Sequence, residues 1–501
     1  MIFREVKLTE LMKRSKFFLL ALVWSLVLVD FWLFSRFTVD DAFITWRYGQ
    51  NLAQHGVWNF NPTTFDPTQS YTNPIYALIS IIPAVLGINV VLFFKLFSVV
   101  LFGCFTYWFL KRRPDSAVYL GLFYAVPATA IHLFSGLETF LFVALVCQLF
   151  IYVKEHSYRA ALVVACVLFI TRPESWTLVL TLPLVLAWSR KRFHVKRFWK
   201  SLAILGSVLS TYFLIHLWIF GELLPNTFFV KSTDASFEAY RFFPLLLVFA
   251  VFIPILLLRF RKVVLLAGLL FIPMIVNYGV SDLTMDYASR YAYHLYASAA
   301  LFVIYVYGAE KHRKQLANMF ARIPFGKLLP TLGVTAISVG FAYTTFFFGI
   351  YQYETYYPRL LNSHAELGKL IEGNFQAVAV GDAGLIPFVS EAKTLDIKAL
   401  GTHLGAKNGV TEKLAEDYGV DFAVFVDGDN AGRNLKPWLR SRAIKPVCSV
   451  TFRPDYQMEL WAAVPTSDLL KLCEQTKRTN GISEYDFFTR DAGNAPWGYW
   501  R

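Results

Sequence analysis

Long runs of apolar residues recur along the first 350 residues and alternate with short polar segments. A helix that crosses a bilayer needs about 20 mostly apolar residues, and most of these runs approach that length. The pattern therefore predicts a polytopic α-helical membrane protein. We expect eleven spans, near residues 17–35, 90–110, 117–134, 139–153, 159–173, 176–189, 201–220, 243–258, 262–280, 291–309 and 328–350.

Basic residues fall between these runs in a way that predicts their orientation. Lys13, Arg14 and Lys16 precede the first run, and Lys and Arg collect on the cytoplasmic side of a membrane. Further basic clusters lie at Lys111–Arg113, Arg190–Lys200, Arg259–Lys262 and Lys311–Lys314. We predict a multi-pass protein of the inner (plasma) membrane, with its N-terminus in the cytoplasm and its C-terminal part outside.

One apolar stretch, residues 74–87, does not fit this alternation, because it is short and contains Pro74 and Pro83. We interpret it as an interfacial or re-entrant helix on the outer face. The predicted outer loops are 36–89, 135–138, 172–175, 221–242 and 281–290, together with the chain after residue 350.

The pattern changes near residue 350, so we predict two domains, a transmembrane catalytic domain at 1–350 and an extracytoplasmic α/β domain at 351–501. Short β-type runs (AVAVGD, KTLDI, DFAVFVD, CSVTF and MELWAAV) alternate there with helical stretches such as TEKLAEDYG. Cys448 and Cys473 are expected to pair in an oxidising compartment. The run GDAG at 381–384 follows a strand but lacks a nucleotide-binding pattern.

Composition supports the membrane prediction, since 56% of the residues are hydrophobic and only 17% are charged. Soluble domains carry roughly 25% charged residues. The net charge of +13 would suit nucleic acid, but the basic clusters fall between apolar runs, as membrane orientation requires. We therefore predict a lipid bilayer and no nucleic acid as the partner of these basic residues.

Asp40 and Asp41 are adjacent, just beyond the first predicted span. A carboxylate at a bilayer surface can stay ionised, whereas one in the hydrocarbon must be paired or neutralised. Adjacent carboxylates at the mouth of a membrane bundle therefore suggest acid/base chemistry on a lipid-linked substrate. The alternative is a solvated helix start, where Asp is favourable in any protein.

Further polar residues gather in the predicted outer loops and suggest one shared cavity, because ionisable groups near membrane depth usually face one. Each also has an ordinary interpretation: Arg172 and Glu174 as an ion pair, Lys231 as a solvated lysine, and Arg290 as an anchor. His294 is more often a satisfied helix residue than a ligand. The candidates are Arg47, Tyr71, Asn73, Glu138, Arg172, Glu174, Asn226, Lys231, Arg290, Tyr291 and His294.

Several short motifs resemble those of GT-C membrane glycosyltransferases, most closely polyprenyl-phosphate-dependent arabinofuranosyltransferases of the terminal β-1,2 mycobacterial arabinan and type IV pilin kinds. They are DDAFITWRYGQNLAQHGVWNFNP, QSYTNPIY, SGLETF, TRPES, LPNTFFVKS, SRYAYHLY, GDAGLIPF and TLDI. Two positions depart from the family pattern: Ser175 stands where Gly is frequent, and Gln69 stands where the family has an acidic residue.

The resemblance implies an inverting transfer of a sugar, D-arabinofuranose, from a polyprenyl phosphate to a hydroxyl of a glycan or protein outside the membrane. Asp40 or Asp41 would be the general base. The donor phosphate would be bound by Arg290 and Lys231, with Arg172 and Arg47 as second choices. Tyr291 and His294 would also contact the donor. The sugar or the acceptor would be contacted by five further side chains, those of Tyr71, Asn73, Glu138, Glu174 and Asn226.

Other functions stay open at this stage. A mannosyl- or aminoarabinose-type transferase would use the same donor class. A lipid-linked sugar transporter or flippase would also place charges in a bundle, although such proteins tend to have inverted repeats. No nucleotide is expected, and the clustered acids leave room for a divalent cation that no ligand spacing requires.

Overall fold

The computed structural model describes residues 2–188, 192–231, 261–280, 286–308, 357–426, 430–453 and 456–477. The predicted spans 243–258 and 328–350 lie outside these ranges. The described residues form two compact units, each considered by itself. The helical unit comprises Met1–Phe37, Phe94–Ser207 and the described part of Ser236–Glu354, and the sheet unit comprises Thr38–Phe93, Val208–Ala235 and the described part of Thr355–Arg501. The predicted boundary at residue 350 stays a prediction.

Among the residues that the structure describes, three helices are long and apolar enough to cross a membrane. They are the Phe17–Phe34 part of α1 (Ile2–Phe34), α5 (Val90–Arg112) and α11 (Val195–Phe220). Together with the composition, they make the chain a membrane protein. The other elements of the helical unit are η1 (Pro114–Ser116), α6 (Ala117–Tyr124), α7 (Pro127–Phe134), α8 (Thr139–Lys154), α9 (Tyr158–Phe169), η2 (Pro173–Thr177), α10 (Leu178–Ala187), α14 (Arg261–Val280), η4 (Tyr287–Ser289) and α15 (Arg290–Tyr307).

The predicted span 117–134 is a bent pair, η1–α6 followed by α7, with an angle of 81° between the two parts. Pro127 begins α7, and the preceding Val126 is extended, as expected of a residue before proline. The helices at the predicted spans 139–153, 159–173 and 176–189 are also shorter than about 20 residues. The number of eleven spans therefore stays a prediction.

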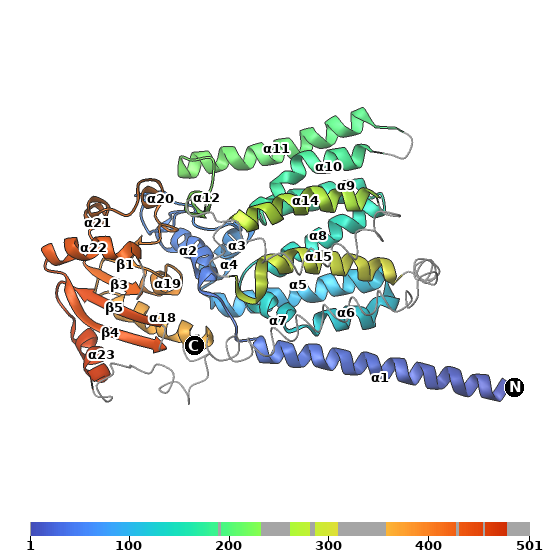
Figure 1. Cartoon of the computed structure of the whole chain (residues 1–501), viewed down its shortest axis with the longest axis horizontal. Coiled ribbons are helices and arrows are strands. Elements are labelled where there is room, and N and C mark those ends of the chain that lie inside the picture. The colour runs from blue at the N-terminus through green and yellow to red at the C-terminus, as the bar shows by residue number, and fades with distance from the viewer. Residues whose placement is uncertain are drawn as a thin grey trace. The chain divides into compact units, whose positions relative to one another are not determined.

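Helix α8 lies at the centre of the helical unit. It packs against α9, α14 and α15, which lie beside it in Figure 1. Phe150 of α8 contacts Phe271 of α14 and Phe302 of α15, with ring centroids 5.6 Å and 5.9 Å away. Because most side chains of α8 are buried, this helix can carry polar groups out of contact with lipid.

The described residues of the sheet unit include five strands in the order β2-β1-β3-β5-β4. Strands β2, β1 and β3 are parallel, whereas β5 pairs antiparallel with both β3 and β4. All five strands overlap the β-type runs predicted from the sequence, although β4 and β5 begin earlier than predicted. Their bounds are β1 (Ala377–Val380), β2 (Lys393–Asp396), β3 (Phe422–Val426), β4 (Lys445–Arg453) and β5 (Tyr456–Ala462).

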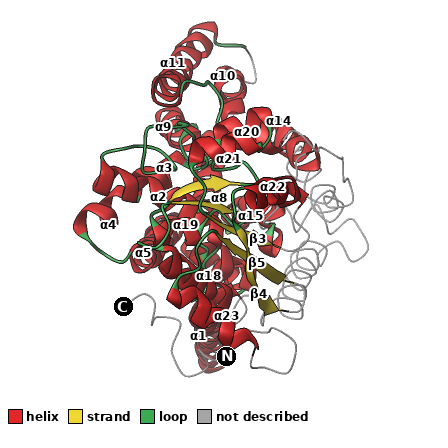
Figure 2. Cartoon of the chain, turned by 90° about the vertical axis from the view of Figure 1, so that its left-hand side faces the viewer, coloured by secondary structure: helices red, strands yellow, loops and turns green. Residues whose placement is uncertain are grey.

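Helices cover both faces of this sheet. Figure 2 shows the strands between these helices. One face packs on α18, α19 and α23, and the other on α21 and α22. The helices of the unit are α2 (Asp40–His55), α3 (Pro74–Ile79), α4 (Ile81–Leu86), α12 (Asn226–Lys231), α18 (Tyr357–Ile371), α19 (Leu385–Ser390), α20 (His403–Asn408), α21 (Glu412–Tyr418), α22 (Asn430–Ser441) and α23 (Ser467–Lys477).

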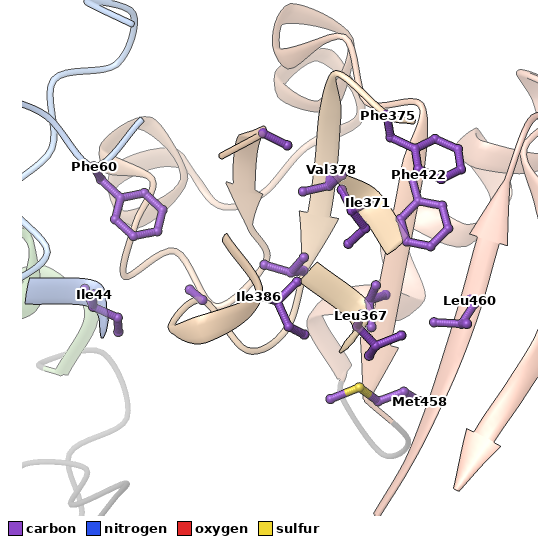
Figure 3. Packing of buried hydrophobic residues seen from close by; sticks show 14 of the residues in the cluster. Ile44, Phe60, Leu367, Ile371, Phe375, Val378, Ile386, Phe422, Met458 and Leu460 are labelled. Atoms are coloured by element: carbon purple, nitrogen blue, oxygen red, sulfur yellow. The ribbon is translucent and has the colours of Figure 1, made fainter. Parts of the chain in front are cut away.

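The core on the α18 face also takes side chains from the segment after α1 (Figure 3). Phe375 stacks on Phe422 with ring centroids 4.3 Å apart, and Ile44 and Phe60 belong to the same buried cluster. The predicted outer loop 36–89 is therefore built into the sheet unit at these two positions. This packing fixes α2, which carries the paired aspartates, against the C-terminal part of the chain.

Local sequence signals account for several boundaries in this unit. Thr411 caps α21 by accepting a hydrogen bond from the backbone N–H of Leu414, and the left-handed Gly419 ends the helix. Cys448 and Cys473 form a disulfide between β4 and α23, the pairing that the sequence predicted. Residues 74–87 form the two short helices α3 and α4, and their interfacial position stays a prediction.

Candidate active site

The paired aspartates are the first two residues of α2, after an extended Val39. Asp40 is only 8% exposed, so it is not the solvated helix start that the sequence left open. Asp41 is half-buried. The two carboxylates therefore have different surroundings although they are neighbours in the chain.

Asp40 is held by the loop between β1 and α19. Its Oδ1 accepts a hydrogen bond from the backbone N–H of Leu385, with an N–O distance of 2.8 Å. Gly384 packs so closely that a Cβ atom there would lie 2.2 Å from Asp40 Oδ2. Only glycine fits at residue 384, because any side chain would displace the Asp40 carboxylate.

His364 of α18 lies between two carboxylates. Its Nδ1 is 3.5 Å from Asp40 Oδ1, and its Nε2 is 3.6 Å from Asp382 Oδ2. Lys398 Nζ is 3.6 Å from the other oxygen of Asp382. Asp382 follows β1 and Lys398 follows β2, and the carboxyl ends of adjacent parallel strands meet at one edge of a sheet.

Burial and charge act in opposite directions on these groups. Burial lowers the pKa of His364, but the carboxylates of Asp40 and Asp382 outweigh it and raise that pKa above its ordinary value. Burial raises the pKa of Asp382 even though His364 and Lys398 act against this. An imidazolium at His364 would thus be stabilised by the carboxylate on each side.

The other candidates in the sheet unit bind protein groups. Arg47 is buried and donates from Nη2 to the carbonyl of Ala392 at 2.8 Å, and burial lowers its pKa to about 9. Asn73 Oδ1 accepts from the hydroxyl of Thr45 at 2.9 Å. These contacts position the local backbone, and the predicted binding roles stay predictions.

Two more candidates in this unit have similar partners. Tyr71 accepts at its hydroxyl from Trp58 Nε1 at 3.1 Å. Asn226 donates to the carbonyls of Ala399 and Leu400 at 2.7 Å and 2.8 Å. Lys231 is the last residue of α12, and its side chain lies outside the described residues.

In the helical unit, Arg172 joins two acids from different elements. It lies 2.6 Å from Glu138 and 2.7 Å from Glu174, and all three side chains are at most 10% exposed. The ion pair of Arg172 and Glu174, which the sequence left as the ordinary interpretation, is thus present. Tyr278 connects the cluster to His294, since its hydroxyl donates to Glu174 at 3.2 Å and lies 3.4 Å from His294 Nδ1.

Arg290 begins α15 and is buried among aromatic rings. Its Nη2 donates to the hydroxyl of Tyr291 at 2.8 Å. Its guanidinium carbon lies 5.3 Å from the ring centroid of Tyr287 and 4.8 Å from that of Tyr291. A guanidinium held in this way keeps a planar fork that suits a phosphate.

Sequence reasoning missed His364 and Lys398 as partners of the paired aspartates. Asp382 was noticed only as part of the GDAG run. No local signal marks His364, which is a single histidine on an amphipathic helix far along the chain. Among the residues that the structure describes, no three His, Cys, Asp or Glu side chains gather in a way that could hold a metal ion.

The sequence matches no protein-family model and no curated protein. Its structure is similar to the crystal structure of ArnT from Cupriavidus metallidurans in the apo state. The TM-score is 0.52, and the match covers 89% of this chain and 97% of ArnT at 15% sequence identity. The chain therefore has a fold similar to that of ArnT.

Proposed function

We propose that this protein is an inverting GT-C glycosyltransferase that moves D-arabinofuranose from a polyprenyl-phosphate donor to a hydroxyl of a cell-envelope glycan or protein at the outer face of the membrane. Three kinds of observation support the proposal: the sequence motifs, the apolar helices and the likeness in fold to ArnT. The observation that carries it is the contrast between Asp40 and Asp41 at the start of α2.

The surroundings of the two carboxylates suggest different roles. Asp40 is buried, is fixed by the Leu385 N–H and faces His364, so an acceptor hydroxyl has less access to it than to Asp41. Asp41 is more exposed and is the carboxylate that we assign as general base. Asp40 would orient the acceptor and stabilise positive charge on the sugar ring in the transition state.

The reaction balances without a co-reactant. The acceptor oxygen attacks C1 of the donor sugar while its proton passes to Asp41. The bond between C1 and the phosphate oxygen breaks, its electron pair stays on the polyprenyl phosphate, and the anomeric configuration inverts. The proton on Asp41 then leaves to water.

Among the candidate cations for the donor phosphate, we favour Arg290. Arg172 already faces two carboxylates, and Arg47 donates to a backbone carbonyl. Arg290 is buried beside the rings of Tyr287 and Tyr291, and its planar guanidinium could bind two phosphate oxygens at once. Lys231 stays a second candidate from the sequence.

The test is an assay of Asp40→Asn and Asp41→Asn with synthetic polyprenyl-phosphate arabinose and a glycan acceptor. We expect the Asp41 variant to lose at least a hundredfold in kcat, in line with the 10²–10⁴-fold typical of general-base catalysis. Asp468→Asn, at an exposed position of α23, is the matched control. Wild-type turnover in both Asp40→Asn and Asp41→Asn would refute the assignment, and a donor panel that includes polyprenyl-phosphate mannose and aminoarabinose tests the sugar.

A further inference from the structure

The sheet unit contains a cavity of about 550 Å³ that the mechanism above does not use. Its walls come from α2, from α4 and the turn after it, from α18 and from α19. Small-molecule sites in proteins are typically clefts of about 300–1,000 Å³ with a few convergent polar groups. The size is therefore suitable for a small ligand.

One wall of the cavity is polar and offers hydrogen-bond acceptors. Gln50 and Gln54 of α2 both donate to Glu391 Oε1, each at 2.9 Å. The carbonyl oxygen of the Gln50 side chain is buried and accepts no hydrogen bond from the described residues. Buried polar atoms normally have a partner, so a ligand that donates from hydroxyl groups would complete this wall.

Glu391 has an unusual backbone conformation at the same place. Its φ of 55° lies in the left-handed region, where it ends α19. Glycine or asparagine is the usual residue there, and strained non-glycine residues cluster at ligand sites. Glu391 thus holds a conformation that costs backbone energy at a position where it lines the cavity.

The remaining lining limits the chemistry of the ligand. Pro83, Ala84 and Ile88 form an apolar wall. The charged residues of the lining are one cation, Lys369, and two anions, Glu372 and Glu391. This excess of negative charge disfavours a phosphate group as the ligand. A sugar is a neutral ring with an apolar face and several hydroxyl groups. It therefore suits both the apolar wall and the polar wall of the cavity.

We propose that this cavity binds a sugar residue of an oligosaccharide acceptor, some rings away from the hydroxyl that reacts. The inference rests on the proposed function for the nature of the acceptor. Helix α2 carries both the proposed base, Asp41, and a residue of the cavity, Gln50. The two residues are roughly 14 Å apart along the helix, which rises about 1.5 Å per residue. Helix α19 also serves both, because Leu385 at its start contacts Asp40 and Glu391 at its end lines the cavity.

The experiment measures binding to the full-length protein in detergent micelles, without donor, by saturation-transfer NMR. The probes are defined arabinofuranosyl and mannopyranosyl oligosaccharides of increasing length. The variants are Gln50→Ala and Glu391→Gly, and the control is Glu412→Gln on the exposed side of α21. Because Glu391→Gly relieves the left-handed backbone, we expect it to fold, and thermal melting checks this.

We expect both cavity variants to weaken oligosaccharide binding at least tenfold and the control to leave it unchanged. In turnover, KM for a long acceptor should rise by a similar factor while KM for a single-sugar acceptor stays constant. Unchanged binding in both variants, no binding of either series by the wild type, or displacement of the sugar by anionic lipid vesicles would each overturn the proposal. Binding that depends on Gln50 in a protein that transfers no sugar would instead contradict the proposed function alone.

Discussion

His364 Nδ1 faces Asp40 Oδ1 at 3.5 Å, and both residues are buried in the sheet unit. The contact joins the start of α2 to a helix that precedes the first strand of the sheet. It gives the C-terminal part of the chain a direct influence on one of the paired aspartates. Under the proposed function, that part is therefore expected to take part in catalysis rather than only to cover the site.

We expect the two amide substitutions of His364 to differ. The amide of His364→Asn can replace Nδ1 beside Asp40, whereas that of His364→Gln can replace Nε2 beside Asp382. If the contact with Asp40 positions the carboxylate, kcat should fall by roughly tenfold in the Asn variant and by roughly a hundredfold in the Gln variant, because small displacements of catalytic groups are this costly. His55→Asn, at the exposed end of α2, is the control, and equal losses in both variants would contradict a positioning role.

The raised pKa of His364 also predicts a pH dependence of stability. The folded protein holds this proton more tightly than the unfolded chain does, so the stabilisation is complete below the ordinary pKa of 6.5. It is lost as the pH rises through the higher folded value. The melting temperature of the wild type should therefore fall more steeply above pH 6.5 than that of His364→Asn, and parallel curves would count against a charged His364.

Gly384→Ala should disrupt the site by steric overlap alone. The added Cβ would lie 2.2 Å from Asp40 Oδ2, so the carboxylate must move. We expect about 1–3 kcal/mol of lost stability from overpacking and a loss of activity of about a hundredfold. Gly206→Ala in α11, where a Cβ meets nothing within 4 Å, is the control, and an active Gly384→Ala would show that the position of Asp40 is unimportant.

Arg172→Met should destabilise the helical unit, because it leaves Glu138 and Glu174 without their shared cation. Removing one partner of a buried ion pair typically costs about 3–5 kcal/mol. The triple variant that also carries Glu138→Gln and Glu174→Gln should recover part of this loss. Thermal melting in detergent measures both, and a destabilisation of the triple variant as large as that of Arg172→Met would argue against charge pairing as the cause.

The disulfide between Cys448 and Cys473 should stabilise the sheet unit. A bridge over a separation of 25 residues is expected to contribute about 2–4 kcal/mol. The double variant Cys448→Ser and Cys473→Ser should melt at a lower temperature and should no longer respond to reductant. Cys104→Ser, at an exposed position in α5, serves as the control.

Much of the fold followed from local patterns. The five strands, the helical stretch that became α21 and the pairing of Cys448 with Cys473 all depend on residues close to the elements they specify. The bend at Pro127 was missed because the apolar run continues across it. Hydropathy reports the length of a run and cannot separate one straight helix from two that meet at an angle.

The site was less accessible to sequence reasoning. The paired aspartates stood out because adjacent charges beside an apolar run are unusual. His364 and Lys398 are ordinary polar residues in their own segments, and only the parallel pairing of β1 with β2 and the packing of α18 bring them near Asp382 and Asp40. Such partners are set by tertiary structure, which leaves no trace in residue spacing.

The hydrogen bond from Leu385 to Asp40 closes a chain separation of 345 residues. During synthesis the ribosome makes Asp40 early and its partner late, so the paired aspartates wait in an unfinished environment while the membrane helices insert. Under the proposed function, the nascent chain is therefore expected to be inert toward lipid-linked sugars until the sheet unit has folded. Activity would then begin only after residues far along the chain have been made and packed.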